Sequence, residues 1–195
     1  MISPRAAGPQ RVSHVIGFDD APFPRDHRGD VIVVGVAYAG LRLEGVLSGK
    51  VRRDGANATT AIAKLVAASR FAHHVQALLL QGIAFAGFNV IDIRRLSEEL
   101  GIGVVSVVRK RPDLGAIERA LLGSVPGGRA KWKLIQAAGP VEPVGRIFMQ
   151  RAGISRPVAS ALLERVTVHG DLPEPVRAAH LIAGGMVTGE SRHRP

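Results

Sequence analysis

The stretch HVIGFDDAPF, residues 14–23, decides the fold, because an apolar run ends there in two acids and a turn. Residues 13–19 read as a buried β-strand, and the Ala-Pro-Phe-Pro that follows the acids is typical of a turn. Asp19 and Asp20 therefore stand at the end of a strand. In that position they either hold a metal ion or only begin the turn.

Two further strands follow directly. Residues 30–40 (DVIVVGVAYAG) are apolar and rich in β-branched side chains, and residues 41–53 (LRLEGVLSGKVRR) alternate between apolar and polar. Ala39 and Gly40 sit where a tight hairpin turn belongs. Three consecutive strands joined by short turns predict an antiparallel meander.

From residue 57 onward the pattern predicts alternating helices and strands. Helices are expected within residues 57–74, 90–100, 113–124, 155–170 and 171–185, and strands within residues 75–84 and 103–110. Asn57 or Thr59 is expected to cap the first helix and Asp113 the third, with Pro175 in the first turn of the last. The apolar run at 75–84 is typical of a central strand covered on both faces.

Together these elements predict one α/β domain over residues 1–195. Its mixed sheet begins with the antiparallel three-stranded meander and continues with strand–helix alternation, in which the later strands are parallel and helices cover both faces. Residues 1–12 and 189–195 are expected to be flexible ends.

The composition favours a polyanionic partner. Lys and Arg number 26 against 16 Asp and Glu, which gives a formal net charge of +10 and suits nucleic acid, although codon bias can also enrich arginine. The absence of cysteine excludes disulfides and thiolate metal sites and fits a reducing cytoplasm. Without 18 consecutive apolar residues or an apolar leader, we expect a cytoplasmic protein with no membrane partner. The oligomeric state is left open.

Polar residues follow several of the predicted strands. Open α/β sheets bind ligands at the carboxyl ends of their parallel strands, and carboxylate or amide oxygens suit Mg²⁺ and Mn²⁺. A hard-cation site facing an anionic substrate is therefore indicated, and two such ions can activate water and neutralise the leaving oxygen of a phosphodiester. The residues at these strand ends are Asp19, Asp20, Asp54, Gln81, Asn89, Asp92, Lys110 and Asp113.

Several of these residues also have a structural interpretation. Asp54 and Gly55 form a common turn dipeptide. Asn89 and Asp92 are suited to capping helices. Lys110, within the run RKR, fits a solvated basic cluster.

Four segments, GFDDAPF, RRDGANAT, GIAFAGFNVIDI and PEPVRAAHLIA, resemble the endonuclease dU family, and the resemblance covers residues 13–191. That family is in turn similar to endonuclease V, a metal-dependent nuclease with a ribonuclease-H-like fold that acts next to deaminated bases. The resemblance implies a ribonuclease-H-like fold and a divalent-metal-dependent endonuclease that hydrolyses phosphodiesters in DNA or RNA, with deaminated bases as candidate targets.

The resemblance also implies roles for individual residues. Asp19 matches the acid after the first strand, Asp54 the acid after the third, and Lys110 the lysine after the fifth, which would stabilise phosphate charge. Gln81 stands where endonuclease V carries an aspartate. A Mg²⁺ or Mn²⁺ site would then consist of Asp19, Asp54 and Gln81, with Asp92 completing it if it can reach.

The segment PEPVRAAH extends the match to His180. Arg177 and His180 are three residues apart and share one face of a helix. His180 would ligate the metal or move a proton, and Arg177 would hold a phosphate or, alternatively, anchor the helix through a salt bridge. The residues assigned to nucleic-acid contact are Arg52, Arg53, Asn89, Arg109, Arg111 and Arg177.

The neutral Gln81 motivates a second hypothesis, as does Asn57, which stands where family members often carry Asp. An amide can coordinate a metal ion but lends it no charge. The chain would then be a nucleic-acid-binding module on the same fold with weakened catalysis. A third possibility, a small-molecule phosphohydrolase, fits the acids but leaves the charge of +10 unexplained.

Overall fold

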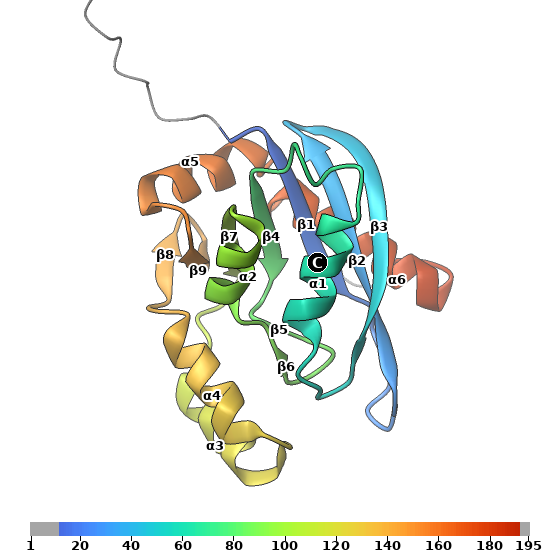
Figure 1. The fold of residues 1–195 in the computed structure, drawn as a ribbon, viewed down its shortest axis with the longest axis vertical. Helices are drawn as coiled ribbons and strands as arrows, with labels where there is room; N and C mark the ends of the chain where they lie inside the picture. Colours follow the sequence, from blue (N-terminus) through green and yellow to red (C-terminus); the bar gives the residue numbers. More distant parts are fainter. Residues whose placement is uncertain (1–11, 192–195) are drawn as a thin grey trace, which may run out of the picture.

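The computed structural model describes residues 12–191 and shows a seven-stranded mixed sheet with helices on both faces (Figure 1). The strands are β1 (His14–Asp20), β2 (Asp30–Ala39), β3 (Arg42–Arg52), β4 (Ala77–Gln81), β5 (Ala84–Phe85), β6 (Asn89–Val90), β7 (Gly103–Val108), β8 (Glu142–Val144) and β9 (Ile147–Ala152). The helices are α1 (Ala58–Ala67), α2 (Ile93–Leu100), α3 (Leu114–Ser124), α4 (Gly128–Ala137), α5 (Arg156–Val166) and α6 (Glu174–Thr188). The flexible ends predicted from the sequence fall largely on residues 1–11 and 192–195, which lie outside the described residues.

The sheet order is β3-β2-β1-β4-β7-β9-β8. β1, β2 and β3 form the predicted antiparallel meander, with its tight turn at Gly40, where φ is 62°. β4 and β7 run parallel to β1, as predicted. β9 pairs antiparallel with β7 and with β8. The predicted mixed α/β sheet is therefore confirmed, and an antiparallel hairpin extends it at the edge opposite the meander.

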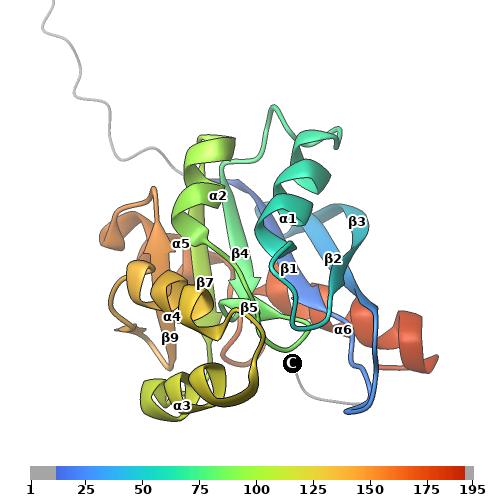
Figure 2. The ribbon, with the colours of Figure 1, turned by 60° about the horizontal axis from the view of Figure 1, so that its bottom comes forward.

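Alternate residues of β1 supply two cores, one on each face of the sheet. Val15 belongs to a cluster that includes Leu162 of α5 and Ala179 of α6. Ile16 belongs to a second cluster, with Ile62 of α1 on the other face. The same division is visible in Figure 2, where α1 and α2 lie on one side of the strands and α6 lies on the other. The central strands are covered twice, which explains their continuous apolar runs.

The sequence analysis missed three features: the β5–β6 hairpin, the β8–β9 hairpin and α4. The β8–β9 hairpin is short, and its outer strand carries Pro143, a residue that weakens a strand prediction and is tolerated at a sheet edge. α4 follows the Gly127-Gly128 pair, which resembles a loop, and its helical face includes a lysine, Lys131. α3 and α4 pack together, and in Figure 1 they lie below β4 and β7.

Helix caps follow the prediction at Asp113, whose carboxylate accepts a hydrogen bond from the Ala116 N–H at 2.9 Å. Asn57 occupies the N-cap position of α1, but its side chain makes no capping hydrogen bond. Residue 189 ends α6 as a left-handed glycine. No helix within residues 12–191 is long and apolar enough to cross a membrane.

The N-terminus of α6 lies directly on β1 because Gly17 has no side chain. A Cβ on Gly17 would lie 2.2 Å from the carbonyl carbon of Pro175, a residue in the first turn of α6 as predicted. From Gly17, two residues of strand lead to Asp19, a rise of about 7 Å. From Pro175, five residues of helix lead to His180, a rise of about 7.5 Å. The contact at Gly17 therefore brings those two side chains to the same level.

We predict that Gly17→Ala destabilises the protein by about 1–3 kcal/mol or more, since the methyl group would overlap rigid backbone. Urea denaturation measures the change in the free energy of unfolding. Gly123→Ala is the matched control: Gly123 lies within α3 with open space around it, so alanine is expected to be neutral or slightly stabilising there. Equal unfolding midpoints for Gly17→Ala and the wild type would contradict the close contact.

Candidate functional site

Asp19, which is buried, and His180, which is partly buried, form a hydrogen-bonded pair where β1 meets α6. Nδ1 of His180 lies 2.7 Å from Oδ2 of Asp19, and the His180 and Asp19 side chains are 25% and 6% exposed. Oδ1 of Asp19 accepts a hydrogen bond from the Asp20 N–H. Burial raises the pKa of Asp19, and the bond to His180 partly opposes that rise. The structure therefore brings together two of the residues selected from the sequence.

Gln81 lies on the same face of the sheet as Asp19. β1 and β4 are parallel with Phe18 beside Leu80, so Asp19 and Gln81 occupy the next position of the register. Leu79, two residues before Gln81, packs in the core cluster beneath α6. Oε1 of Gln81 is buried and, among the described residues, has no hydrogen-bond partner. A buried acceptor without a donor is costly and indicates a missing partner.

Asp20 points to the opposite side of β1 from Asp19, as the alternation of a strand requires. Its Oδ2 accepts a hydrogen bond from the Ala86 N–H at 2.8 Å. Burial and the neighbouring Asp19 carboxylate raise the pKa of Asp20 to about 7. Asp20 is therefore a second perturbed carboxyl group at this strand end, although the family resemblance assigned it no role.

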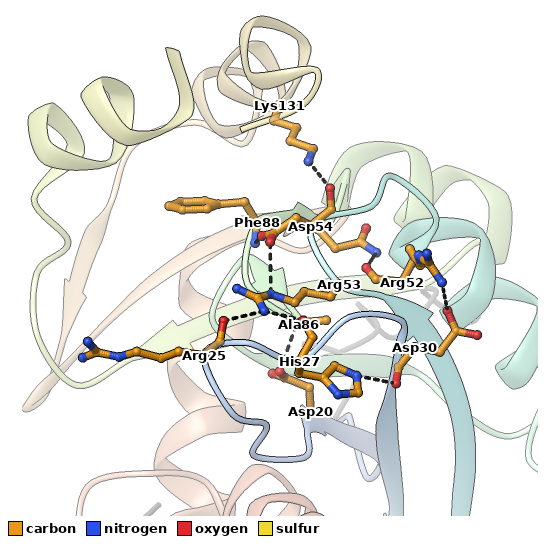
Figure 3. Close-up of polar contacts among 11 residues, drawn as sticks. Asp20, Arg25, His27, Asp30, Arg52, Arg53, Asp54, Ala86, Phe88 and Lys131 are labelled. Carbon is orange, nitrogen blue, oxygen red and sulfur yellow. Dashed lines mark hydrogen bonds and ion pairs between the residues drawn. The ribbon is translucent and has the colours of Figure 1, made fainter. Parts of the chain in front are cut away.

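Asp54 is held in the β3–α1 turn by several polar contacts (Figure 3). Its Oδ1 accepts from the Phe88 N–H at 2.8 Å, and its Oδ2 lies 3.2 Å from Nε of Arg53. Its own N–H donates to the carbonyl of Ala86, and its φ is 49°. In this arrangement the carboxylate fixes the turn against the β5–β6 hairpin.

Asn89 is fully buried and serves the start of α1. Its Oδ1 accepts from the Ala58 N–H at 3.0 Å, and its Nδ2 donates to the Arg52 carbonyl and to Oδ1 of Asn57. Every polar atom of its amide is therefore engaged inside the protein. The nucleic-acid contact expected of Asn89 is not available in this structure, and the capping alternative describes what is seen.

Asp92 caps α2 on the face of the sheet opposite to Asp19. Its carboxylate accepts from the Arg95 N–H at 3.1 Å, and α2 packs through Leu96 into the cluster beneath α1 and α2. The structure does not bring Asp92 to Asp19 or Gln81. The interpretation of Asp92 as a helix cap, left open by the sequence, describes this geometry.

The basic residues selected from the sequence lie in two settings. Arg109, Lys110 and Arg111 are exposed after β7, and their side chains have no hydrogen bond or ion pair within the described chain. Arg177 instead donates to Oε2 of Glu174 at 2.7 and 2.9 Å. That ion pair is the anchoring role considered as the alternative for Arg177, and it stabilises the first turn of α6.

Lys131 is a buried cation that the sequence analysis did not single out. It is 5% exposed, and its Nζ donates to the carbonyl oxygen of Asp54 at 2.6 Å. Burial lowers the pKa of Lys131, and the Asp54 carboxylate partly opposes this. Lys131 and Ile135 are spaced four residues apart on the buried face of α4, the periodic signal from which this position could have been inferred.

The arrangement offers a cation an incomplete set of ligands. Within residues 12–191 no three His, Asp or Glu side chains are grouped closely enough to hold a metal ion. The four-residue set expected from the sequence is divided: Asp19 and Gln81 share one face, Asp92 lies on the other, and Asp54 is engaged in the turn. The unpartnered Oε1 of Gln81 beside the Asp19 carboxylate fits one hard cation.

A mixed sheet of this order, with a buried acid at the carboxyl end of its first strand, defines a ribonuclease-H-like α/β protein. Endonuclease V of Ciona intestinalis, solved with a 24-mer DNA containing an inosine followed by a ribo-adenosine, aligns with a TM-score of 0.55 at 15% identity, covering 87% of this chain and 83% of that one. The predicted fold class is therefore confirmed.

The chain belongs to the endonuclease dU family, whose model matches residues 11–187. A UPF0215 protein of Deinococcus radiodurans is 52% identical over 181 residues, which are 93% of this chain and 92% of the relative. The crystal structure of a protein of unknown function from Archaeoglobus fulgidus aligns with a TM-score of 0.84 at 31% identity, covering 90% of this chain and 98% of that one. The family resemblance noted in the sequence is thereby confirmed.

We predict that Asp20→Asn increases stability at pH 8 more than at pH 5. In the unfolded chain this carboxyl group loses its proton near the ordinary pKa of 3.8, whereas in the folded chain its pKa is about 7. The folded state therefore binds more protons between these values, and the free energy of unfolding falls as pH rises. Asparagine removes this loss, because it carries no titrating proton, and its amide oxygen can still accept from the Ala86 N–H.

The difference between the two pH values is expected to be on the order of 1–3 kcal/mol, measured by urea denaturation in EDTA. Asp113→Asn is the matched control, because asparagine is an equally good helix cap there. A constant difference between Asp20→Asn and wild type from pH 5 to pH 8 would show that Asp20 does not retain its proton.

Proposed function

We propose that this chain is a divalent-metal-dependent endonuclease that hydrolyses phosphodiesters in DNA or RNA next to deaminated bases. One observation carries the proposal: the Asp19–His180 pair lies beside the unpartnered Oε1 of Gln81, at the carboxyl ends of the parallel strands β1 and β4, where open α/β sheets bind ligands. The family name and the DNA complex of the Ciona relative support nucleic acid as the substrate.

Mg²⁺ or Mn²⁺ would be held by the Asp19 carboxylate and the Gln81 amide oxygen. When bound, such an ion lowers the pKa of water and offsets negative charge on a phosphate. The donors fit one ion better than two, because Asp54 is engaged with Arg53 and Phe88.

His180 is positioned by Asp19 to handle a proton. Asp19 bonds Nδ1, which fixes the ring and leaves Nε2 without a hydrogen bond among the described residues. Nε2 can then take a proton from an attacking water or give one to the leaving oxygen, a role that contributes about 10²–10⁴-fold in other enzymes. Lys110, exposed after β7, is the candidate to contact the phosphate.

A second candidate is a nucleic-acid-binding module with weakened catalysis. The neutral Gln81 and the engagement of Asp54 in the turn favour it, because only one carboxylate, that of Asp19, then faces the cation. The two candidates differ in whether the strand is cut, and both use the basic surface.

The first test is cleavage of uracil- and hypoxanthine-containing DNA and RNA oligonucleotides in the presence of Mn²⁺. We predict that Asp19→Asn and His180→Gln each lower the rate at least about 100-fold, because each removes a group that acts in the reaction. Asp113→Asn, the matched exposed aspartate, is expected to cut at the wild-type rate. Wild-type cleavage by Asp19→Asn would assign the activity to another site, and no cleavage of any substrate by the wild type would favour the binding module.

The second test restores the missing charge. We predict that Gln81→Asp strengthens binding of Mn²⁺, because a carboxylate replaces a neutral amide at the same position. The readout is the increase in stability on adding Mn²⁺, which reaches about 2.7 kcal/mol at 100 times the dissociation constant. The combined variant Asp19→Asn/Gln81→Asp is the control and should lose most of that increase. An equal response to Mn²⁺ in wild type and Gln81→Asp would place the metal elsewhere.

A further inference from the structure

A basic pocket of about 340 Å³ lies between the β1–β2 loop and the β3–α1 turn. We call it the arginine pocket, after the four arginines in its wall, Arg25, Arg28, Arg52 and Arg53. Only two carboxylates line it within the described chain, those of Asp26 and Asp54, so the four guanidinium groups leave it with a net positive charge. Its volume is at the lower end of the range for small-ligand sites.

Arg53 holds the pocket in shape. Its guanidinium donates to the carbonyl of Arg25 at 2.6 Å and also to the carbonyl of His27, and it lies 3.2 Å from the Asp54 carboxylate (Figure 3). It lies 5.6 Å from the ring centroid of Phe23 as well. Arg53 therefore supports the loop from inside, and its charge is paired with the Asp54 carboxylate. Its guanidinium group is less available for the nucleic-acid contact expected from the sequence.

Arg25 and Arg28 are the free cations of the pocket. Both are exposed, and neither side chain has a hydrogen bond or ion pair within the described chain. In Figure 3 the Arg25 side chain extends away from Arg53 and is joined to no other residue by its guanidinium. Arg52 is held loosely, 3.8 Å from Asp30, with 63% of its side chain exposed.

Unpaired guanidinium groups on a fixed loop indicate an anion. Gathering like charges in a small space costs free energy, and an anionic ligand offsets that cost. The planar guanidinium group of arginine can donate two parallel hydrogen bonds to the oxygens of one phosphate. Arg53 donates hydrogen bonds to the carbonyls of Arg25 and His27, so the loop is already ordered without a ligand. This order lowers the entropic cost of binding.

The arginine pocket is linked to the end of β1 through Asp20 and Ala86. The β1–β2 loop begins directly after Asp20, and Arg25 follows that acid by about five residues, a reach of at most about 18 Å. Ala86 links the two regions, because its N–H donates to Asp20 and its carbonyl accepts from Asp54, a residue of the pocket wall. A strand bound at the acids can thus extend to the arginines.

We propose that the arginine pocket binds a backbone phosphate of the nucleic-acid strand, a few nucleotides from the phosphodiester at Asp19, through Arg25 and Arg28. The identification of that phosphate as part of a strand rests on the proposed function. The pocket thereby sets the position of the strand, whereas Asp19, Gln81 and His180 act on it.

The test is fluorescence anisotropy of a labelled single-stranded oligonucleotide over a series of salt concentrations in EDTA, where no cleavage occurs. The variant Arg25→Gln/Arg28→Gln is expected to bind about tenfold more weakly and to reduce the slope of log affinity against log salt by about 0.7 for each phosphate that the protein no longer neutralises. The control Arg42→Gln/Lys64→Gln removes the same charge away from the pocket and is expected to stay within about twofold of wild type. Urea denaturation verifies that both variants fold.

If the two double variants bind the oligonucleotide with equal affinity and equal salt dependence, the proposal that the arginine pocket binds a phosphate is wrong, whatever the cleavage assay shows. Conversely, a selective loss in the pocket variant supports it even if the wild type cuts no substrate, so the two proposals fail separately. A deoxyadenosine monophosphate arm separates the sources of phosphate. If the mononucleotide stabilises the wild type but not the pocket variant while oligonucleotide binding is unchanged, the site takes free phosphate monoesters and the strand proposal is wrong.

Discussion

The contact between Gly17 and Pro175 is the constraint on which the site depends. Because β1 carries no side chain at residue 17, α6 lies against the strand backbone and runs alongside it. That approach places His180 within 2.7 Å of Asp19, two strand residues further on. A larger side chain at residue 17 would lift the helix and separate the pair without touching either member. The contact between Asp19 and His180 therefore depends on the absence of a Cβ at residue 17.

The two adjacent acids at the end of β1 have separate roles because a strand directs successive side chains to opposite faces. Asp19 faces α6 and shares its face with Gln81. Asp20 faces the β5–β6 hairpin, where its carboxylate accepts a hydrogen bond from the Ala86 N–H, and the Ala86 carbonyl accepts one from the Asp54 N–H. One face therefore carries the catalytic candidates, and the other holds together the turns that form the arginine pocket.

Much of the fold followed from the sequence, because the meander and the helices have strong periodicity and clear turn residues such as Gly40. The site followed only in part. Asp19 and His180 were selected from local sequence motifs, and the structure places them together. The hydrogen-bond partners of Asp54 and Asn89, by contrast, come from segments distant in the chain. Local pattern gives no sign of such pairings. The burial of Lys131 was hidden for the same reason, since it depends on α4 docking against the β3–α1 turn.

The central claim is that one divalent cation binds between β1 and β4, and anomalous diffraction from crystals soaked in Mn²⁺ tests it most directly. The account predicts a peak about 2.0–2.3 Å from a carboxylate oxygen of Asp19 and a similar distance from Oε1 of Gln81. A Mn²⁺ peak at Asp54 or Asp92 with none at Asp19 would contradict it.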